Sequence, residues 1–307
     1  MYLSENATGS KSMFYRRKIA LSLLRLFGGE LPKLQMQKYL FLTGIRQEKP
    51  SYEFVPHRYG CFSFQAEADR RTMIKYGWLK NNDEWSLAST TNHAASLRDE
   101  DIAALHEVKR VYGRLSRNAL LKRIYLEHPF FAINSEVLDD VLDAVEAASV
   151  RSPTPKPRGR TVFTLGYEGV ALERFLRSLV IHDVRVLCDV RRNPLSMKYG
   201  FSKTQLSRAC DALGIRYVHL PDLGIASAKR QKLDSPADYA RLFDEYEQTT
   251  LQSSTASLQT IMDLVDTNKR IALVCFEASH EDCHRSRLAA ALPHLQGWNT
   301  PIRHISA

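Results

Sequence analysis

Four apolar runs in the second half of the chain are each followed at once by residues that can bind anions or transfer protons. The runs are "TVFTL", "VRVLCDV", "IRYVHL" and "RIALVCFE". Carboxylates at such positions can act as general acids or bases, and arginines can hold a phosphate through paired hydrogen bonds. The residues that we single out are Gly166, Tyr167, Glu168, Asp189, Arg191, Arg192, Asn193, His219, Asp222, Glu277, Cys283, His284 and Arg285.

Each of these runs is a predicted strand, and amphipathic helices are predicted between them. The helical segments are "ALERFLRSLVIH", "SKTQLSRACDAL", "SPADYARLFDEYEQ" and "SRLAAALPHL", and "PIRHIS" is a last strand. Strands that alternate with helices predict a parallel sheet with right-handed crossovers. We therefore expect an α/β fold with an open, Rossmann-like parallel sheet. Ligands of such sheets bind at the carboxyl ends of the strands, so the four corners should form one site.

The first half of the chain has a different pattern and predicts a mainly helical domain. "RRKIALSLLRLFGG" and "LPKLQMQKYLFLTG" have helical periodicity, and Gly28 and Gly29 should end the first helix. A short hairpin is expected to turn at 81–83. The stretch "FVPHRYGCFSFQAEADRRTMIKYGWL" resembles the small winged-helix-like domains of antitoxin- and defence-associated proteins. That resemblance implies DNA binding and a role in phage defence.

A proline-rich basic stretch, "RSPTPKPRGR", separates the two halves. Alternating prolines prevent a helix or a central strand, so we read residues 151–160 as a linker. The predicted domains are therefore a winged-helix-like domain at 1–150 and an α/β domain at 161–307.

The charge balance predicts a polyanionic partner. The chain carries 43 basic and 34 acidic residues, for a net charge of +9, and nucleic acid, here DNA, is the commonest such partner. Arg58 and a helical segment supply the predicted contacts, with an ordinary turn and a solvated helix as the alternatives. The predicted DNA-binding residues are Arg58, Lys109, Arg110, Arg114, Arg117, Lys122 and Arg123.

The hydropathy and the cysteine content of the sequence indicate the compartment in which the protein acts. The sequence has no apolar run long enough to span a membrane, and its first residues lack the apolar core of a secretory signal. Its five cysteines have no framework spacing, which suits a reducing compartment. We expect a cytoplasmic protein that does not contact a membrane. The oligomeric state is not predicted.

The motifs of the second half resemble, in order, the blocks of bacterial domain-of-unknown-function family 488. The matching blocks are "TLGYEG", "DVRRNP", "GFSK", "IRYVHLPDLG" and "CFEASHEDCHR", from Thr161 to about Leu292. The resemblance implies an α/β fold and a cytoplasmic protein. It implies no particular activity. It marks Gly166, Tyr167, Glu168, Asp189, Arg191, Arg192, Asn193, Pro194, Glu277, Cys283, His284 and Arg285 as motif positions.

The last of these blocks has three chemical interpretations. Cys275, Cys283 and His284 are soft metal ligands, but adjacent Cys283 and His284 are a poor pair for one tetrahedral ion, so no metal is expected. Cys283 near a helix start is a candidate thiolate nucleophile. The third interpretation is an anion corner, where Cys283 and Arg285, with the helix N–H groups, bind phosphate. Gly166, Arg191, Arg192 and Asn193 are further expected substrate or phosphate contacts.

The motifs that the sequence lacks reduce the number of reactions that we consider. It has no phosphate-binding P-loop, no dinucleotide fingerprint and no zinc-deaminase signature. Hydrolysis of an N-glycosidic bond needs a carboxylate and a proton donor but no cofactor, so none is expected. Asp189 or Glu277 would be the carboxylate, with Glu168 at the same edge, although ion pairs with local arginines are an alternative role. Tyr167 or His284 would be the donor, and Tyr167 could stack on a base.

We therefore predict a DNA base N-glycosylase, which would act on a base extruded from the duplex. Two alternatives remain open. One is a non-catalytic DNA-binding regulator with a nucleotide-sensing α/β domain, and the other is a metal-dependent nuclease.

Overall fold

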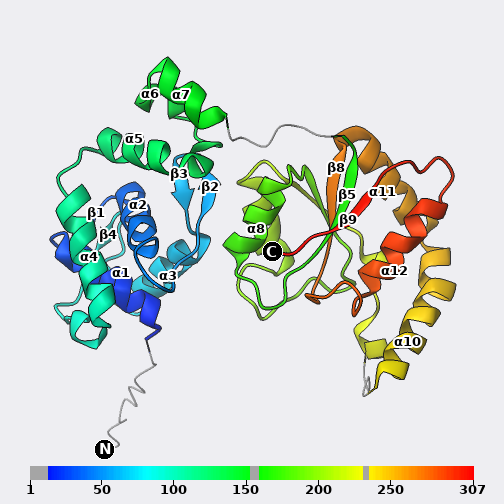
Figure 1. Ribbon diagram of the computed structural model, residues 1–307. Coiled ribbons are helices and arrows are strands. Elements are labelled where there is room, and N and C mark those ends of the chain that lie inside the picture. The colour runs from blue at the N-terminus through cyan, green and yellow to red at the C-terminus, as the bar shows by residue number, and fades with distance from the viewer. Residues whose placement is uncertain (1–12, 153–158, 231–234) are drawn as a thin grey trace, which may run out of the picture. The chain divides into compact units, whose positions relative to one another are not determined.

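The computed structural model describes residues 13–152, 159–230 and 235–307. The chain divides into two compact units, Met1–Glu53 with Gln65–Ile124, and Phe54–Phe64 with Tyr125–Ala307 (Figure 1). Most of the predicted linker, residues 153–158, lies outside the described residues. The domain boundaries at 150 and 160 therefore stay predictions.

The first unit is mainly helical, as expected. Its elements are α1 (Tyr15–Leu26), β1 (Glu30–Leu31), α2 (Lys33–Gly44), α3 (Phe64–Lys75, whose first residue belongs to the second unit), β4 (Trp85–Ser86) and α4 (Asp99–Tyr112). α1 ends at two glycines, Gly28 and Gly29, whose φ angles of 95° and 88° are left-handed. β1 pairs antiparallel with β4, and Leu79 bridges to Leu87. The predicted hairpin around 81–83 is thus confirmed.

A buried carboxylate holds the first unit together. Asp69 on α3 is 1% exposed and accepts hydrogen bonds from Arg16, Arg17 and Tyr52. The Nε atoms of Arg16 and Arg17 lie 2.6 and 2.8 Å from its two oxygens. Because a buried charge is tolerated only when it is paired, these contacts fix the N-terminus of α1 against α3.

The last part of the first predicted domain differs from the sequence expectation in one respect. The single helical segment expected after residue 106 is two helices, because α4 ends at Tyr112 and α5 (Arg117–Glu127) begins after a break. Further elements are the hairpin β2 (Val55–His57) and β3 (Gly60–Phe62), α6 (Leu138–Val141) and α7 (Ala144–Arg151). α7 begins with a capping box in which Asp143 and Glu146 satisfy each other's backbone N–H groups.

The second unit contains the predicted parallel sheet, in the order β7-β6-β8-β5-β9. All four pairings are parallel. The strands are β5 (Thr161–Gly166), β6 (Val186–Asp189), β7 (Arg216–His219), β8 (Arg270–Cys275) and β9 (Ile302–His304). The α/β fold class is confirmed, and all five strands fall on the predicted runs.

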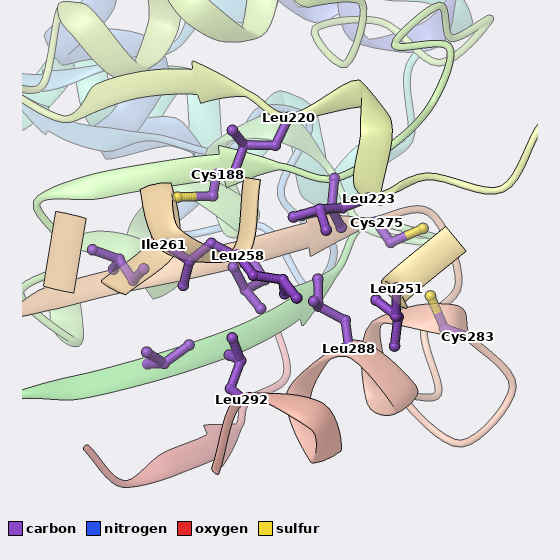
Figure 2. Close-up of a cluster of buried hydrophobic side chains, with 14 of the residues drawn as sticks. Cys188, Leu220, Leu223, Leu251, Leu258, Ile261, Cys275, Cys283, Leu288 and Leu292 are labelled. Carbon is purple, nitrogen blue, oxygen red and sulfur yellow. The ribbon is translucent and has the colours of Figure 1, made fainter. Parts of the chain in front are cut away.

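Helices cover both faces of this sheet (Figure 1). They are α8 (Leu172–Ile181), α9 (Lys203–Asp211), α10 (Pro236–Glu245), α11 (Thr255–Asn268) and α12 (His284–Ala291). α8 and α9 pack on one face around Phe163 and Leu187. α10, α11 and α12 pack on the other around Ile271 and Leu273, in the cluster of which Figure 2 shows a part. α11 and the π-helical turn Tyr246–Leu251 before it were not predicted.

Two general expectations can be compared with the described residues. None of the helices described is both long and apolar enough to cross a membrane. All five cysteines are free and buried.

The Asp69 cluster generates a stability prediction. Asp69→Ala leaves the partly buried side chains of Arg16 and Arg17 without their carboxylate, which should lower the free energy of unfolding by about 3 kcal/mol. Asp83→Ala is the control, because Asp83 is fully exposed in its pair with Lys33, and it should change stability by less than about 0.5 kcal/mol. Urea denaturation measures both, and equal losses would contradict the proposed role of Asp69.

Candidate functional site

The polar corners predicted from the sequence meet at the carboxyl edge of the sheet. β5 ends at Gly166, β6 at Asp189, β7 at His219 and β8 at Cys275. Two of the hollows at this edge adjoin each other. One, of about 290 Å³, is lined by Tyr167, Arg191, Arg192, Asn193, Leu195, Ser196, Met197, Ile225, Cys275 and Phe276. The other, of about 890 Å³, is lined by residues that include Glu168, Phe276 and Glu277. Phe276 borders both, so the two hollows adjoin.

Asp189 has a different role from the catalytic one that we expected. Its carboxylate is fully buried, and Arg191 binds it through Nε at 2.8 Å and Nη2 at 2.5 Å. The Tyr217 hydroxyl donates to the same carboxylate at 2.5 Å. Burial acts to lower the pKa of Arg191, but the hydrogen bonds and charge of Asp189 outweigh it and raise that pKa. Asp189 therefore orients a permanent cation, which is the ion-pair alternative, and does not face a substrate.

Tyr167 is also part of this buried network. It is 2% exposed, and its ring stacks on Phe201 with centroids 4.2 Å apart. Arg191 Nη1 donates to its hydroxyl at 2.6 Å. The expected stacking of Tyr167 on a base is therefore wrong, because the ring is packed in the core.

Arg192 and Asn193 are the exposed polar residues of the smaller hollow. Arg192 Nη1 donates to Asp222 at 3.0 Å, and its side chain is 51% exposed. The backbone of Arg192 lies against Gly224. A Cβ atom at Gly224 would lie 2.1 Å from the backbone nitrogen of Arg192. These contacts hold the loop after β6 against the loop after β7. Arg192 and Asn193 thus remain candidate anion contacts, with buried Arg191 behind them.

We had expected Gly166 to contact phosphate. The structure instead gives this glycine a role in packing. A Cβ atom at Gly166 would lie 1.8 Å from the carbonyl oxygen of Glu277. Glu168, in the loop after β5, accepts a hydrogen bond on its Oε2 atom from the backbone N–H of Ala278, at 3.0 Å. Glycine at this position therefore lets the loops after β5 and β8 meet. They hold exposed Glu168 and half-buried Glu277 on one wall of the larger hollow.

Arg285 closes the loop that contains Glu277. Its side chain is 1% exposed and donates to the carbonyl oxygens of Glu277 and Ala278. The expected phosphate contact of Arg285 is therefore wrong, since its guanidinium faces the backbone. A buried cation that binds two carbonyl groups fixes the position of the loop.

Cys283 and His284 lie at the start of α12, as predicted, but both are buried. Burial raises the pKa of the Cys283 thiol far above its usual range, and Cys275 and Glu277 raise it further. The predicted thiolate nucleophile is therefore not supported, and the buried side chains do not form an exposed anion corner. His284 is likewise not a proton donor to the solvent. Its Nδ1 atom lies with the sulfurs of Cys275 and Cys283 in one cluster.

The predicted DNA-binding residues are distributed over exposed and partly buried surface. Arg110 pairs with Glu107, while Lys109 and Arg123 lie over aromatic rings. Arg58, at the tip of the β2–β3 hairpin, lies 3.5 Å from Glu136. Lys122 is half-buried. Arg114 and Arg117 are exposed at the break between α4 and α5, so their DNA contact stays a prediction.

Sequence reasoning missed two sets of exposed residues. Arg71 and Lys75 are exposed on α3, and the pair of arginines in "DRRTMIK" was the available signal. Leu195 and Met197 border the smaller hollow with exposed fractions of 74% and 104%. Apolar side chains so exposed beside a cation-lined hollow are typical of a contact surface. Their only signal was two apolar residues in the loop "RRNPLSMKYG".

The close contact at Gly166 generates a prediction about the site. Gly166→Ala should push the Glu277 loop away and lower the free energy of unfolding by about 1–3 kcal/mol, because an added methyl group has no space. Gly159→Ala is the control, since a Cβ atom there meets nothing within 4 Å. Thermal or urea unfolding compares the two variants. Equal stability of both would contradict the close approach of the two loops.

Comparison with known proteins agrees with the fold and the motifs. Neither the curated proteins nor the solved structures contain a match to the chain. One family model matches residues 171–292, from the start of α8 to the end of α12. This segment contains β6, β7 and β8, with Asp189, Glu277 and Cys283. Residues 171–292 therefore match the family described as "Domain of unknown function DUF488", as the motifs indicate.

Proposed function

We propose that the protein is a cytoplasmic enzyme that acts on DNA and hydrolyses the N-glycosidic bond of a base. The observation that carries this proposal is the pair of hollows that meet at Phe276. One is lined by Arg191, Arg192 and Asn193, and the other contains the carboxylates of Glu168 and Glu277. Cations beside carboxylates suit a substrate that combines a phosphate with a bond to be cleaved.

The first unit supports DNA as the substrate class. Its order of α1, β1, α2 and α3, followed by the Leu79–Leu87 bridge and by β4, which pairs with β1, agrees with a winged-helix interpretation once the β2–β3 hairpin is set aside as an insertion. Exposed Arg71 and Lys75 lie on α3, the helix that would contact DNA. The net charge of +9 favours a polyanion. A defence role remains part of the proposal only through this winged-helix resemblance.

The proposed mechanism uses the exposed side chains at the carboxyl edge of the sheet. Arg192 and Asn193 would bind the phosphates that flank the target nucleotide, with buried Arg191 adding its charge. Glu277, with Glu168 beside it, would stabilise the positive charge that develops on the sugar and would orient the attacking water. Asp189 would act through Arg191, as a positioning residue.

Leu195 and Met197 have a specific part in this proposal. An enzyme that reacts at a base within a duplex must extrude that base, and apolar side chains often fill the space that it leaves. Both residues project from the loop that also bears Arg192. They are therefore suited to enter the base stack while the extruded nucleotide occupies the hollow.

The reaction is tested by incubating the full chain with unmodified and modified duplex DNA. Mass spectrometry measures released bases, and alkali treatment reveals abasic sites on a gel. Glu277→Gln should lower the rate of base release by about 10²–10⁴-fold, since it removes the charged carboxylate. Asp263→Asn, an exposed change on α11, should leave the rate unchanged.

Other results of this assay would contradict the proposal. Strand breaks without released base, on addition of Mg²⁺ or Mn²⁺, would indicate a nuclease. Tight DNA binding with no product would indicate a regulator. Full activity of the Glu277→Gln variant would remove the carboxylate mechanism.

The wedge role of the apolar residues gives a separate prediction. The double change Leu195→Ala and Met197→Ala should slow base release from duplex DNA by about tenfold, because unstacking a paired base costs a few kcal/mol. Release from single-stranded DNA should change little, since its bases need no extrusion. Equal losses on both substrates would show that these residues contribute to folding or to general binding instead.

A further inference from the structure

Three potential metal ligands converge below the smaller hollow. The Sγ atoms of Cys275 and Cys283 and the Nδ1 atom of His284 all lie within 4.8 Å of one another, and all three residues are buried. Cys275 is the last residue of β8, Cys283 is the residue before α12, and His284 is the first residue of α12. Figure 2 shows Cys275 and Cys283 together at one end of the apolar cluster, away from Cys188.

We propose that Cys275, Cys283 and His284 bind a zinc ion. In a tetrahedral zinc site, bond lengths of about 2.3 Å to sulfur and 2.0 Å to nitrogen place neighbouring sulfur and nitrogen atoms about 3.6 Å apart. In this structure Nδ1 of His284 lies 3.6 Å from Sγ of Cys275 and 3.9 Å from Sγ of Cys283. The nitrogen is therefore spaced from each sulfur as two ligands of a single ion are, and the two sulfurs lie within 4.8 Å of each other.

The second nitrogen of His284 gives independent support. Nε2 lies 3.2 Å from the backbone carbonyl oxygen of Val190, at the end of β6. A carbonyl oxygen only accepts, so Nε2 carries the hydrogen and Nδ1 of the neutral ring presents its lone pair to the two sulfurs. Metal-binding histidines characteristically donate their other N–H to such an acceptor, which fixes the orientation of the ring.

The adjacency of Cys283 and His284, which made this site unattractive from the sequence, is accommodated by the start of α12. Cys283 is the residue before the helix and is extended, with φ −134° and ψ 137°, while His284 is the first helical residue. The change in backbone direction lets both side chains reach one point. His284 uses Nδ1, the ring nitrogen nearer its backbone, so a short reach suffices.

Charge also favours an ion at this place. Two thiolates would be unstable at this burial without a cation, and a divalent ion supplies the charge that stabilises them. Oε2 of Glu277 lies 3.1 Å from Sγ of Cys275. Three protein ligands leave the fourth zinc position to water. The alternative is that both cysteines are ordinary apolar core residues, as cysteines often are.

The experiment measures zinc in the purified full chain by elemental mass spectrometry, after chelation, reconstitution with zinc and gel filtration. We expect one zinc per chain. Cobalt in place of zinc should give the intense visible absorption of a tetrahedral cobalt–thiolate site, which reports sulfur ligands without any substitution in the chain. Removal of zinc by a chelator should lower the unfolding temperature reversibly.

Matched variants separate a metal site from an apolar core. Cys283→Ser and His284→Gln should weaken zinc binding about tenfold or more. Cys188→Ser is the control, because Cys188 is a fully buried cysteine of the same cluster, and it should keep the zinc content. Circular dichroism confirms the fold of each variant.

The proposal is overturned if folded wild-type protein takes up no zinc and gives no cobalt–thiolate absorption. It is also overturned if folded Cys283→Ser and His284→Gln variants bind zinc as the wild type does. The inference does not rest on the proposed function. Zinc content is measured without DNA, so base release and zinc binding can each fail while the other succeeds.

Discussion

The buried ion pair between Asp189 and Arg191 is the interaction on which the geometry of the carboxyl edge depends. It lies where β6 ends, and both partners are almost completely buried. Tyr217 on β7 donates to the carboxylate, and Tyr167, directly after β5, accepts from the guanidinium. Removing one partner of such a pair typically costs about 3–5 kcal/mol, because it leaves an uncompensated buried charge. Three strand ends are thus held to one another by a single charge pair.

The loops beyond that pair are held by close backbone contacts. Gly166 permits contact with Glu277, and Gly224 permits contact with Arg192. Arg285 then binds the carbonyl groups of the Glu277 loop from within the core. These contacts restrain the loops and so favour a rigid position for the groups that lie on them. This rigidity is what a site that stabilises a developing charge requires.

The sequence predicted much of the fold, because its apolar runs and helical periodicity are unambiguous in the α/β half. α11 was missed because its start lies in a Ser- and Thr-rich stretch of weak helix propensity, "QTTLQSSTAS". The convergence of four corners followed from the topology of parallel strands. The roles of individual residues did not, since Asp189 and Glu277 look alike in the sequence, whereas burial separates them. Whether Cys283 and His284 can share one ion depends on backbone direction at the start of α12, which spacing alone does not convey.

In the proposed reaction, the carboxylates at the edge bind the developing sugar cation. The most direct test is the affinity for a duplex in which a cationic pyrrolidine replaces the target deoxyribose, compared with a duplex that contains the neutral tetrahydrofuran analogue. An enzyme that stabilises an oxocarbenium-like transition state should bind the cationic duplex at least about 100-fold more tightly. The Glu277→Gln variant should lose that preference. Equal affinity for the two duplexes, or a preference that persists in the variant, would contradict the account.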